Sequence, residues 1–125
     1  MDDYSLKVKL YLEDSQEKFM GIGVLWLLQK IEECGSLRAA TINLGISYSK
    51  AFKMIENLEA SLGQPVLERK RGGSNRIGAS LTPFGLQFVA LYDNFQKQCK
   101  TLLKEPFDDF MKNLSNLKQE FDKKD

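Results

Sequence analysis

The sequence contains no histidine and only two cysteines, and both shortages narrow its chemistry. Without histidine there is no Ser-His-Asp or Cys-His arrangement, and the commonest general base and metal ligand are missing. Cys34 and Cys99 lie far apart and form no CxxC pair, so neither a disulfide scaffold nor a zinc site is expected. We therefore predict a protein that is not an enzyme and that uses no metal and no cofactor.

Long apolar runs are also missing. The sequence contains no run of about 18 apolar residues, which is the length needed to span a bilayer. The segment Met1–Leu12 lacks the apolar core of a signal peptide. The 125 residues are 42% hydrophobic and 28% charged, which is typical of one globular domain with, at most, an appendage. We expect a cytoplasmic protein with no membrane partner.

Charge is unevenly distributed along the chain. The formal net charge is +1, but residues 36–85 hold seven bases against three acids. Residues 1–35 hold four bases against seven acids, and residues 86–125 are balanced. A basic middle third on a neutral protein suits a polyanionic partner, although chance clustering of solvated lysines would look the same.

The spacing of apolar residues predicts three helices in a row. Residues 17–33 are apolar on nearly every side, so this helix needs cover on more than one face. A short alanine-rich helix over 37–43 and a longer one over 47–62 are joined by a tight turn at Gly45, which is the outline of a helix-turn-helix. Serine caps and glycine stops frame these helices, at Gly35, Ser36, Gly45, Ser47 and Gly63.

A strand, a basic loop and a return strand follow the third helix. Residues 65–69 and 79–81 are the expected strands, and the loop 70–78 contains a double glycine at 72–73. A hairpin in this place is a wing. The double glycine belongs to no GxxxxGK[ST] motif, so nucleotide binding is rejected. A further half-buried strand is expected over Leu6–Leu12, where apolar and polar residues alternate.

The third helix has two faces at 100° per residue. Its apolar face carries Ala51, Ile55, Leu58 and Leu62, and its polar face carries Ser49, Lys50, Lys53, Glu56 and Asn57. Asparagine pairs with adenine and lysine can donate to guanine, while Glu56 could accept from cytosine or repel phosphate. An ordinary solvated helix face would look similar, but the basic loop that follows favours DNA. The predicted contacts to double-stranded DNA are Arg38, Ser47, Tyr48, Ser49, Lys50, Lys53, Asn57, Arg69, Lys70, Arg71 and Arg76.

The C-terminal third is predicted to form two helices, over 84–103 and 106–122, separated by a break at Pro106. The first carries an apolar stripe at Phe84, Phe88, Leu91, Phe95, Cys99 and Leu102. The second carries a heptad seam at Phe107, Phe110, Leu114, Leu117 and Phe121. A small monomer cannot easily cover these faces. We therefore predict a homodimer whose interface includes Trp26, Phe84, Phe88, Leu91, Phe95 and Leu102.

Several short motifs together resemble the N-terminal domain of the ModE family of molybdate-responsive regulators and, more distantly, LysR-type regulators. The resemblance runs from about Leu25 to Tyr92, and its motifs are Gly35–Ala40, Gly45–Phe52, Leu67–Arg69, Gly72–Gly73 and Leu81–Gly85. It implies sequence-specific DNA binding by a homodimer in transcriptional control. The implied fold is mostly α, a winged helix-turn-helix with a small antiparallel sheet and C-terminal dimerisation helices.

The chain departs from the ModE pattern after the wing. No strand-rich segment follows that could build an oxyanion pocket, so we expect no molybdate-binding domain and no response to molybdate. The expected organisation is a DNA-binding domain over 1–83 and dimerisation helices over 84–125. Two alternatives stay open: a winged helix that binds a protein instead of DNA, and an enzyme built on paired carboxylates.

Overall fold

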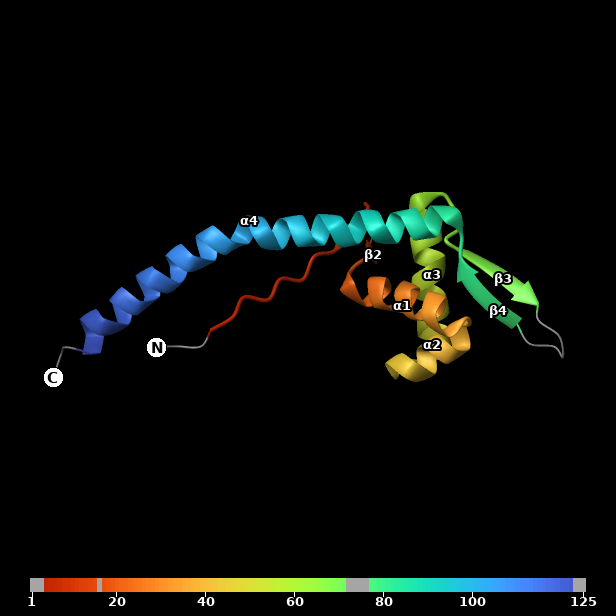
Figure 1. Ribbon diagram of the computed structural model, residues 1–125, viewed down its shortest axis with the longest axis horizontal. Helices are drawn as coiled ribbons and strands as arrows, with labels where there is room; N and C mark the ends of the chain where they lie inside the picture. The colour runs from red at the N-terminus through yellow and green to blue at the C-terminus, as the bar shows by residue number, and fades with distance from the viewer. Residues whose placement is uncertain (1–3, 16, 72–76, 123–125) are drawn as a thin grey trace. The chain divides into compact units, whose positions relative to one another are not determined.

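The computed structural model describes residues 4–15, 17–71 and 77–122 (Figure 1). By its internal contacts the chain divides into two units, one over Lys9–Asp93 and one formed by Met1–Val8 with Asn94–Asp125. The described elements are, in chain order, β1 (Leu12–Glu13), β2 (Lys18–Met20), α1 (Ile22–Cys34), α2 (Leu37–Leu44), α3 (Tyr48–Leu62), β3 (Leu67–Arg71), β4 (Ile77–Leu81) and α4 (Pro83–Asp122). No helix among these residues is both long enough and apolar enough to cross a bilayer.

The predicted caps set the ends of α2 and α3. The Ser36 Oγ accepts a hydrogen bond from the Ala39 N–H at 3.0 Å, and the Ser47 Oγ accepts one from the Lys50 N–H at 3.1 Å. Gly45 adopts φ 72° in the turn between the two helices, a left-handed conformation that glycine reaches without steric cost. The helix-turn-helix predicted from the sequence is therefore confirmed.

One apolar core joins the three helices and the wing strands. Leu27, Leu28 and Ile31 on α1 are fully buried, together with Leu58 on α3 and Val66 before β3. Burying one such side chain contributes about 1.5–3 kcal/mol. The helix α1 is thus covered on one broad side, whereas its exposed side retains a large apolar residue, Trp26, which is 55% exposed.

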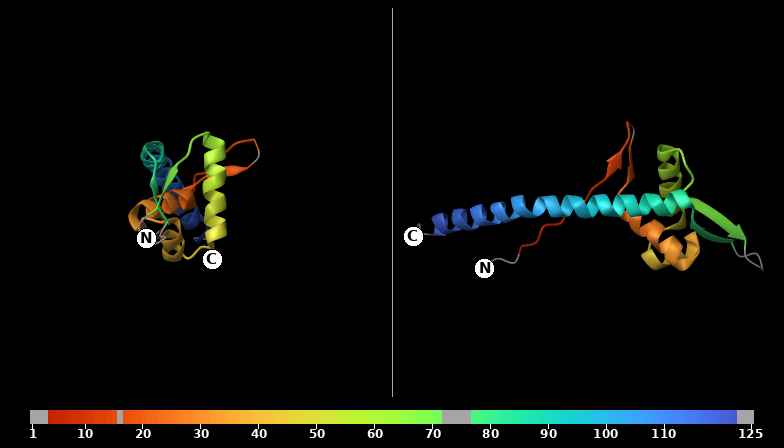
Figure 2. Two further views of the ribbon diagram at one scale, coloured as in Figure 1. Left: turned by 90° about the vertical axis from the view of Figure 1, so that its right-hand side faces the viewer. Right: turned by 45° about the horizontal axis from the view of Figure 1, so that its top comes forward.

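The strands β3 and β4 form the wing as an antiparallel pair in the register Leu67↔Leu81 to Arg71↔Ile77. Figures 1 and 2 show this hairpin extending away from the three helices. The wing is attached to α1 by two hydrogen bonds. The Ala79 N–H donates to the Gly35 carbonyl at 2.8 Å, and the Leu81 N–H donates to Glu32 Oε1 at 2.9 Å.

The N-terminal prediction is wrong in two respects. None of the described residues from Tyr4 to Tyr11 lies in a strand, because an alternating pattern supplies no pairing partner by itself. Instead the chain turns at Asp14, and β2 pairs with the short β1 over residues that were predicted to begin the first helix. The segment before β1 is held by the buried Tyr92, whose hydroxyl donates to the Leu10 carbonyl at 2.9 Å. This burial raises the pKa of Tyr92.

The predicted break at Pro106 is also wrong, since α4 continues through this proline to Asp122. A helical proline loses one hydrogen bond and clashes with the preceding turn, at a cost of about 3 kcal/mol. A helix end, however, needs residues that can leave the helical conformation. The sequence has no glycine after Gly85, so no left-handed cap is available beside Pro106.

Candidate nucleic-acid interface

The first turns of α3 present a polar surface. The side chains of Ser49, Lys50 and Lys53 are exposed, and the ring of Tyr48 is partly exposed beside them. The cap at Ser47 fixes where this surface begins, because its hydroxyl is used by the Lys50 N–H. The helix N-terminus also directs unpaired N–H groups outward, which favours a negatively charged partner.

A hollow of about 340 Å³ adjoins this surface. It lies where α2, α3 and the wing meet, and its charged walls are Arg38 from α2 and Arg69 from β3. Tyr48 and the backbone of Gly78 complete its polar lining. Two guanidinium groups and a phenol converge here from three elements, and guanidinium is the side-chain group whose geometry best matches a phosphate.

Aromatic contacts position one of these arginines. The Arg69 guanidinium carbon lies 5.5 Å from the centre of the Phe52 ring, and that ring stacks on Tyr48 with centroids 6.3 Å apart. Cation–π contact holds a guanidinium without neutralising it. Arg69 is therefore oriented but keeps its full charge for a ligand.

Among the described residues, no carboxylate pairs with the cations of this surface. Across the part of the chain that the structure describes, none of Arg38, Lys50, Lys53 or Arg69 forms an ion pair with a carboxylate. Lys30, by contrast, pairs with Glu33 at 3.3 Å on α1. Over the same described residues no three metal-ligating side chains gather.

The remaining predicted DNA contacts are divided between other places. Asn57 is half-buried on the flank of α3, where it lines a second groove together with Lys50. Lys70 is exposed on β3. Arg71 ends that strand, but its side chain lies outside the described residues, as do Arg76 and the whole tip of the predicted loop.

Residues of the predicted dimer interface are largely uncovered. Leu91 is 70% exposed and Phe84 is partly exposed, stacked on Phe88 with ring centroids 6.4 Å apart. Further along α4, Phe95 is 43% exposed and Leu102 is 75% exposed. Each therefore keeps apolar surface that contacts within the chain leave in water.

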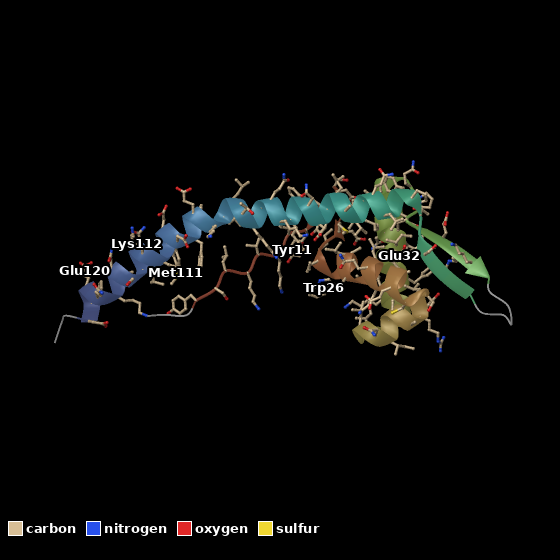
Figure 3. All side chains as sticks on the ribbon, in the orientation of Figure 1. Tyr11, Trp26, Glu32, Met111, Lys112 and Glu120 are labelled. Carbon is tan, nitrogen blue, oxygen red and sulfur yellow. The ribbon has the colours of Figure 1, made fainter. Side chains whose placement is uncertain are left out.

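Two glutamates that position the interface were missed by the sequence analysis. Glu59 on α3 accepts hydrogen bonds from the Val66 and Leu67 N–H groups at 2.7 and 3.3 Å, which ties α3 to the wing. Glu32 on α1 accepts from the Leu81 N–H, and Figure 3 labels this side chain near the base of the wing. The only sequence signal for Glu59 is an acid in the last turn of a helix, where the helix dipole disfavours it.

A helix-turn-helix followed by a two-stranded wing, with unpaired cations beside the second helix of the motif, defines a winged-helix DNA-binding domain. The family model for the bacterial regulatory helix-turn-helix protein, lysR family, matches residues 23–86. The chain belongs to this family of DNA-binding transcriptional regulators.

Curated relatives share sequence with part of this chain. The chain is 31% identical over 91 residues to the transcriptional regulator ModE of Haemophilus influenzae. This match covers 73% of this chain and 36% of that protein. It is 33% identical over 84 residues to the molybdenum-pterin-binding protein MopB of Rhodobacter capsulatus, covering 67% of this chain and 31% of that protein. The chain thus spans about a third of the length of these relatives.

Solved structures confirm the fold. The CbnR DBD–DNA complex matches with a TM-score of 0.56 at 24% identity, covering 71% of this chain and 97% of that chain. A LysR family transcriptional regulator matches with a TM-score of 0.51 at 23% identity, covering 69% of this chain and 30% of that chain. The predicted winged helix-turn-helix, mostly helical with small antiparallel sheets, is therefore correct.

Proposed function

We propose that this chain binds double-stranded DNA sequence-specifically as a homodimer, with α3 in the major groove and the wing along the backbone. The observation that carries the proposal is the hollow between Arg38, Tyr48 and Arg69, whose two arginines lack counter-ions among the described residues. A DNA phosphate is the ligand that this geometry suits best. Its capture would fix the register of α3 on the duplex.

In this proposal the exposed face of α3 reads bases. Ser49, Lys53 and the half-buried Asn57 are the candidates for base edges, since their donors and acceptors match purines in the major groove. Lys50, Lys70, Arg71 and Arg76 supply further backbone charge. Two protomers would place their recognition helices about 34 Å apart and therefore favour an inverted-repeat site.

The same proposal assigns no catalytic step to this chain. In this proposal the chain recognises DNA and needs no cofactor. Binding takes place in the cytoplasm, where DNA is accessible. The alternative of a winged helix that binds only proteins would leave Arg38 and Arg69 uncompensated without a polyanion to approach them. That alternative predicts no affinity for any duplex.

The test is a salt titration of binding to DNA fragments selected by the purified protein, measured by fluorescence anisotropy. If about four phosphates are neutralised per protomer, the slope of log affinity against log salt should be roughly −7 per dimer. Arg38→Ala and Arg69→Ala should each make that slope shallower by about two per dimer while leaving the preferred sequence unchanged. Lys30→Ala is the matched control, because Glu33 already neutralises that lysine.

Base readout is tested in the same assay. Asn57→Ala or Ser49→Ala should relax the preference at one base position, at a cost of about 1–3 kcal/mol. Arg76→Ala should weaken all sequences evenly. An affinity that does not change with salt would refute the phosphate contacts, and an unchanged preferred site in both helix variants would refute the major-groove assignment.

A further inference from the structure

A second concave site lies on the flank of α3, within the unit formed by Lys9–Asp93. It is a groove of about 510 Å³ between β2 with the residues just before β1, the first two turns of α1, and the flank of α3 from Lys50 to Asn57. Its apolar walls come from all three elements and include Tyr11, Phe19, Val24, Trp26 and Met54. Figure 3 labels Tyr11 and Trp26, the two largest of these side chains.

The charge of the groove has one sign. Lys9, Lys18 and Lys50 line it, and no aspartate or glutamate is among the described residues that line it. The Lys18 Nζ lies 4.4 Å from the centre of the Tyr11 ring, so this ammonium is held against the aromatic wall of the groove. Three cations around an apolar floor match an anion that carries an apolar body.

We propose that this groove binds a small organic carboxylate with an aromatic or aliphatic body. The volume falls within the range of small-molecule sites, which are mostly apolar with a few placed polar groups. The carboxylate would pair with the lysines, and the body would cover the exposed side of Trp26. Asn57 adds an amide that can donate to the second carboxylate oxygen.

The groove shares a residue with the DNA-binding surface, and this part of the inference rests on the proposed function. Lys50 lines the groove and lies in the first turn of α3, where it is proposed to contact DNA. A carboxylate paired with Lys50 would remove one cation from the DNA surface. Because coupling between two sites is reciprocal, the carboxylate would weaken DNA binding and DNA would weaken carboxylate binding by the same factor.

The site can be tested with the protein's own fluorescence. Trp26 is the single tryptophan of the sequence and lines this groove, so at a fixed protein concentration a change in emission on adding a ligand reports on the surroundings of this one side chain. Titration with octanoate should shift the Trp26 emission, whereas octanol, which has the same chain and no charge, should bind about tenfold more weakly or worse. Calorimetry on the same samples measures the affinity independently of the fluorophore.

Two variants test separately how the charge and the shape of the groove contribute to octanoate binding. Lys18→Gln removes an exposed cation and should weaken octanoate about tenfold. Gly23→Leu adds a side chain at a position that lines the groove, and because a Cβ there meets nothing within 4 Å, the fold has room for it while the groove becomes narrower. It should abolish binding by calorimetry. Gln29→Leu, at an exposed position of α1 outside the groove, is the control and should bind octanoate normally.

Each outcome decides one part of the inference. Equal affinity for octanol and octanoate, or normal octanoate binding by both Lys18→Gln and Gly23→Leu, would overturn the carboxylate site. Emission that changes with protein concentration but not with octanoate would assign the groove to a second copy of the chain instead. If octanoate binds but leaves DNA affinity unchanged, the coupling through Lys50 is wrong. If no DNA binds at all, the proposed function fails, while the octanoate titration still decides the groove.

Discussion

Two glycines in the first turns of helices have opposite surroundings. A Cβ on Gly85 in α4 would lie 2.5 Å from the Val66 carbonyl oxygen and 3.2 Å from its carbon, so backbone would have to move. A Cβ on Gly23 in α1 would meet nothing within 4 Å. The first glycine permits a close approach between α4 and the backbone of Val66, just before β3, whereas the second costs helix stability without an internal packing reason.

The prediction compares Gly85→Ala with Gly23→Ala. Gly85→Ala should lower the free energy of unfolding by about 1–3 kcal/mol, because the added methyl overpacks against main chain that cannot rotate away. Gly23→Ala should leave it unchanged or raise it by up to about 1 kcal/mol through helix propensity. Urea denaturation followed by circular dichroism measures both, and equal effects of the two substitutions would contradict the close-approach argument.

Local residue chemistry was predictable where its cause is local. The caps at Ser36 and Ser47 were recovered because a serine hydroxyl reaches an N–H three residues ahead. The bond from the Leu81 N–H to Glu32 joins residues 49 positions apart, and nothing in the neighbourhood of either residue signals it. The same holds for Arg38 and Arg69, which were predicted separately and which only the fold brings to one hollow.

At the scale of elements, Pro106 is the feature that the sequence rules misjudged. The helix α4 contains it as an interior residue, so one turn lacks a main-chain hydrogen bond. Pro106→Ala restores that bond and should stabilise α4 by up to about 3 kcal/mol. Thermal scans at 222 nm should show the change as a higher melting temperature of the helical signal.

Lys104→Ala is the control for Pro106→Ala, since it exchanges an exposed residue two positions earlier for the same alanine. Its effect should stay within about 0.5 kcal/mol. If Pro106→Ala instead lowered the melting temperature, the proline would serve a bend that the native state requires, and the simple cost of a helical proline would not apply.

The elements that were predicted correctly are those with both a strong period and an end signal. The helices α2 and α3 have a serine at the start and a left-handed glycine at the end. The segment Leu6–Leu12 has the period of a strand, but a strand also needs a neighbour, and the pairing of β1 with β2 is set by the turn at Asp14 instead. Periodicity alone therefore predicted a strand at Leu6–Leu12 that does not form, whereas periodicity combined with end signals predicted α2 and α3 correctly.

At the scale of the whole molecule, the apolar side chains on α4 require an explanation. At 100° per residue Phe84, Leu91, Phe95 and Leu102 fall within about 40° of one another around a helix. Each stays partly or largely exposed in the single chain. The buried residues Tyr92 and Gln96 lie on a different face of the helix. A seam of this kind is typical of a helix that packs against a second copy.

The prediction for the proposed homodimer is that Phe95→Asp yields monomers. A carboxylate placed in an apolar seam costs several kcal/mol if the partner buries it. Asn94→Asp is the matched control, because it adds the same charge to an adjacent exposed position about 100° away on the helix. Sedimentation velocity should give a dimer for the wild type and Asn94→Asp, and a monomer for Phe95→Asp.

DNA affinity should follow the oligomeric state. A dimer binds the second half-site at the high effective concentration set by the first, so loss of dimerisation weakens binding to an inverted repeat without removing a DNA contact. Phe95→Asp should therefore weaken binding to a fragment with two half-sites far more than binding to a fragment with one half-site. Asn94→Asp should change both affinities only by the small amount that its added negative charge causes. A wild-type protein that sediments as a monomer at micromolar concentration would refute the proposed dimer interface, because there would then be no dimer for Phe95→Asp to disrupt.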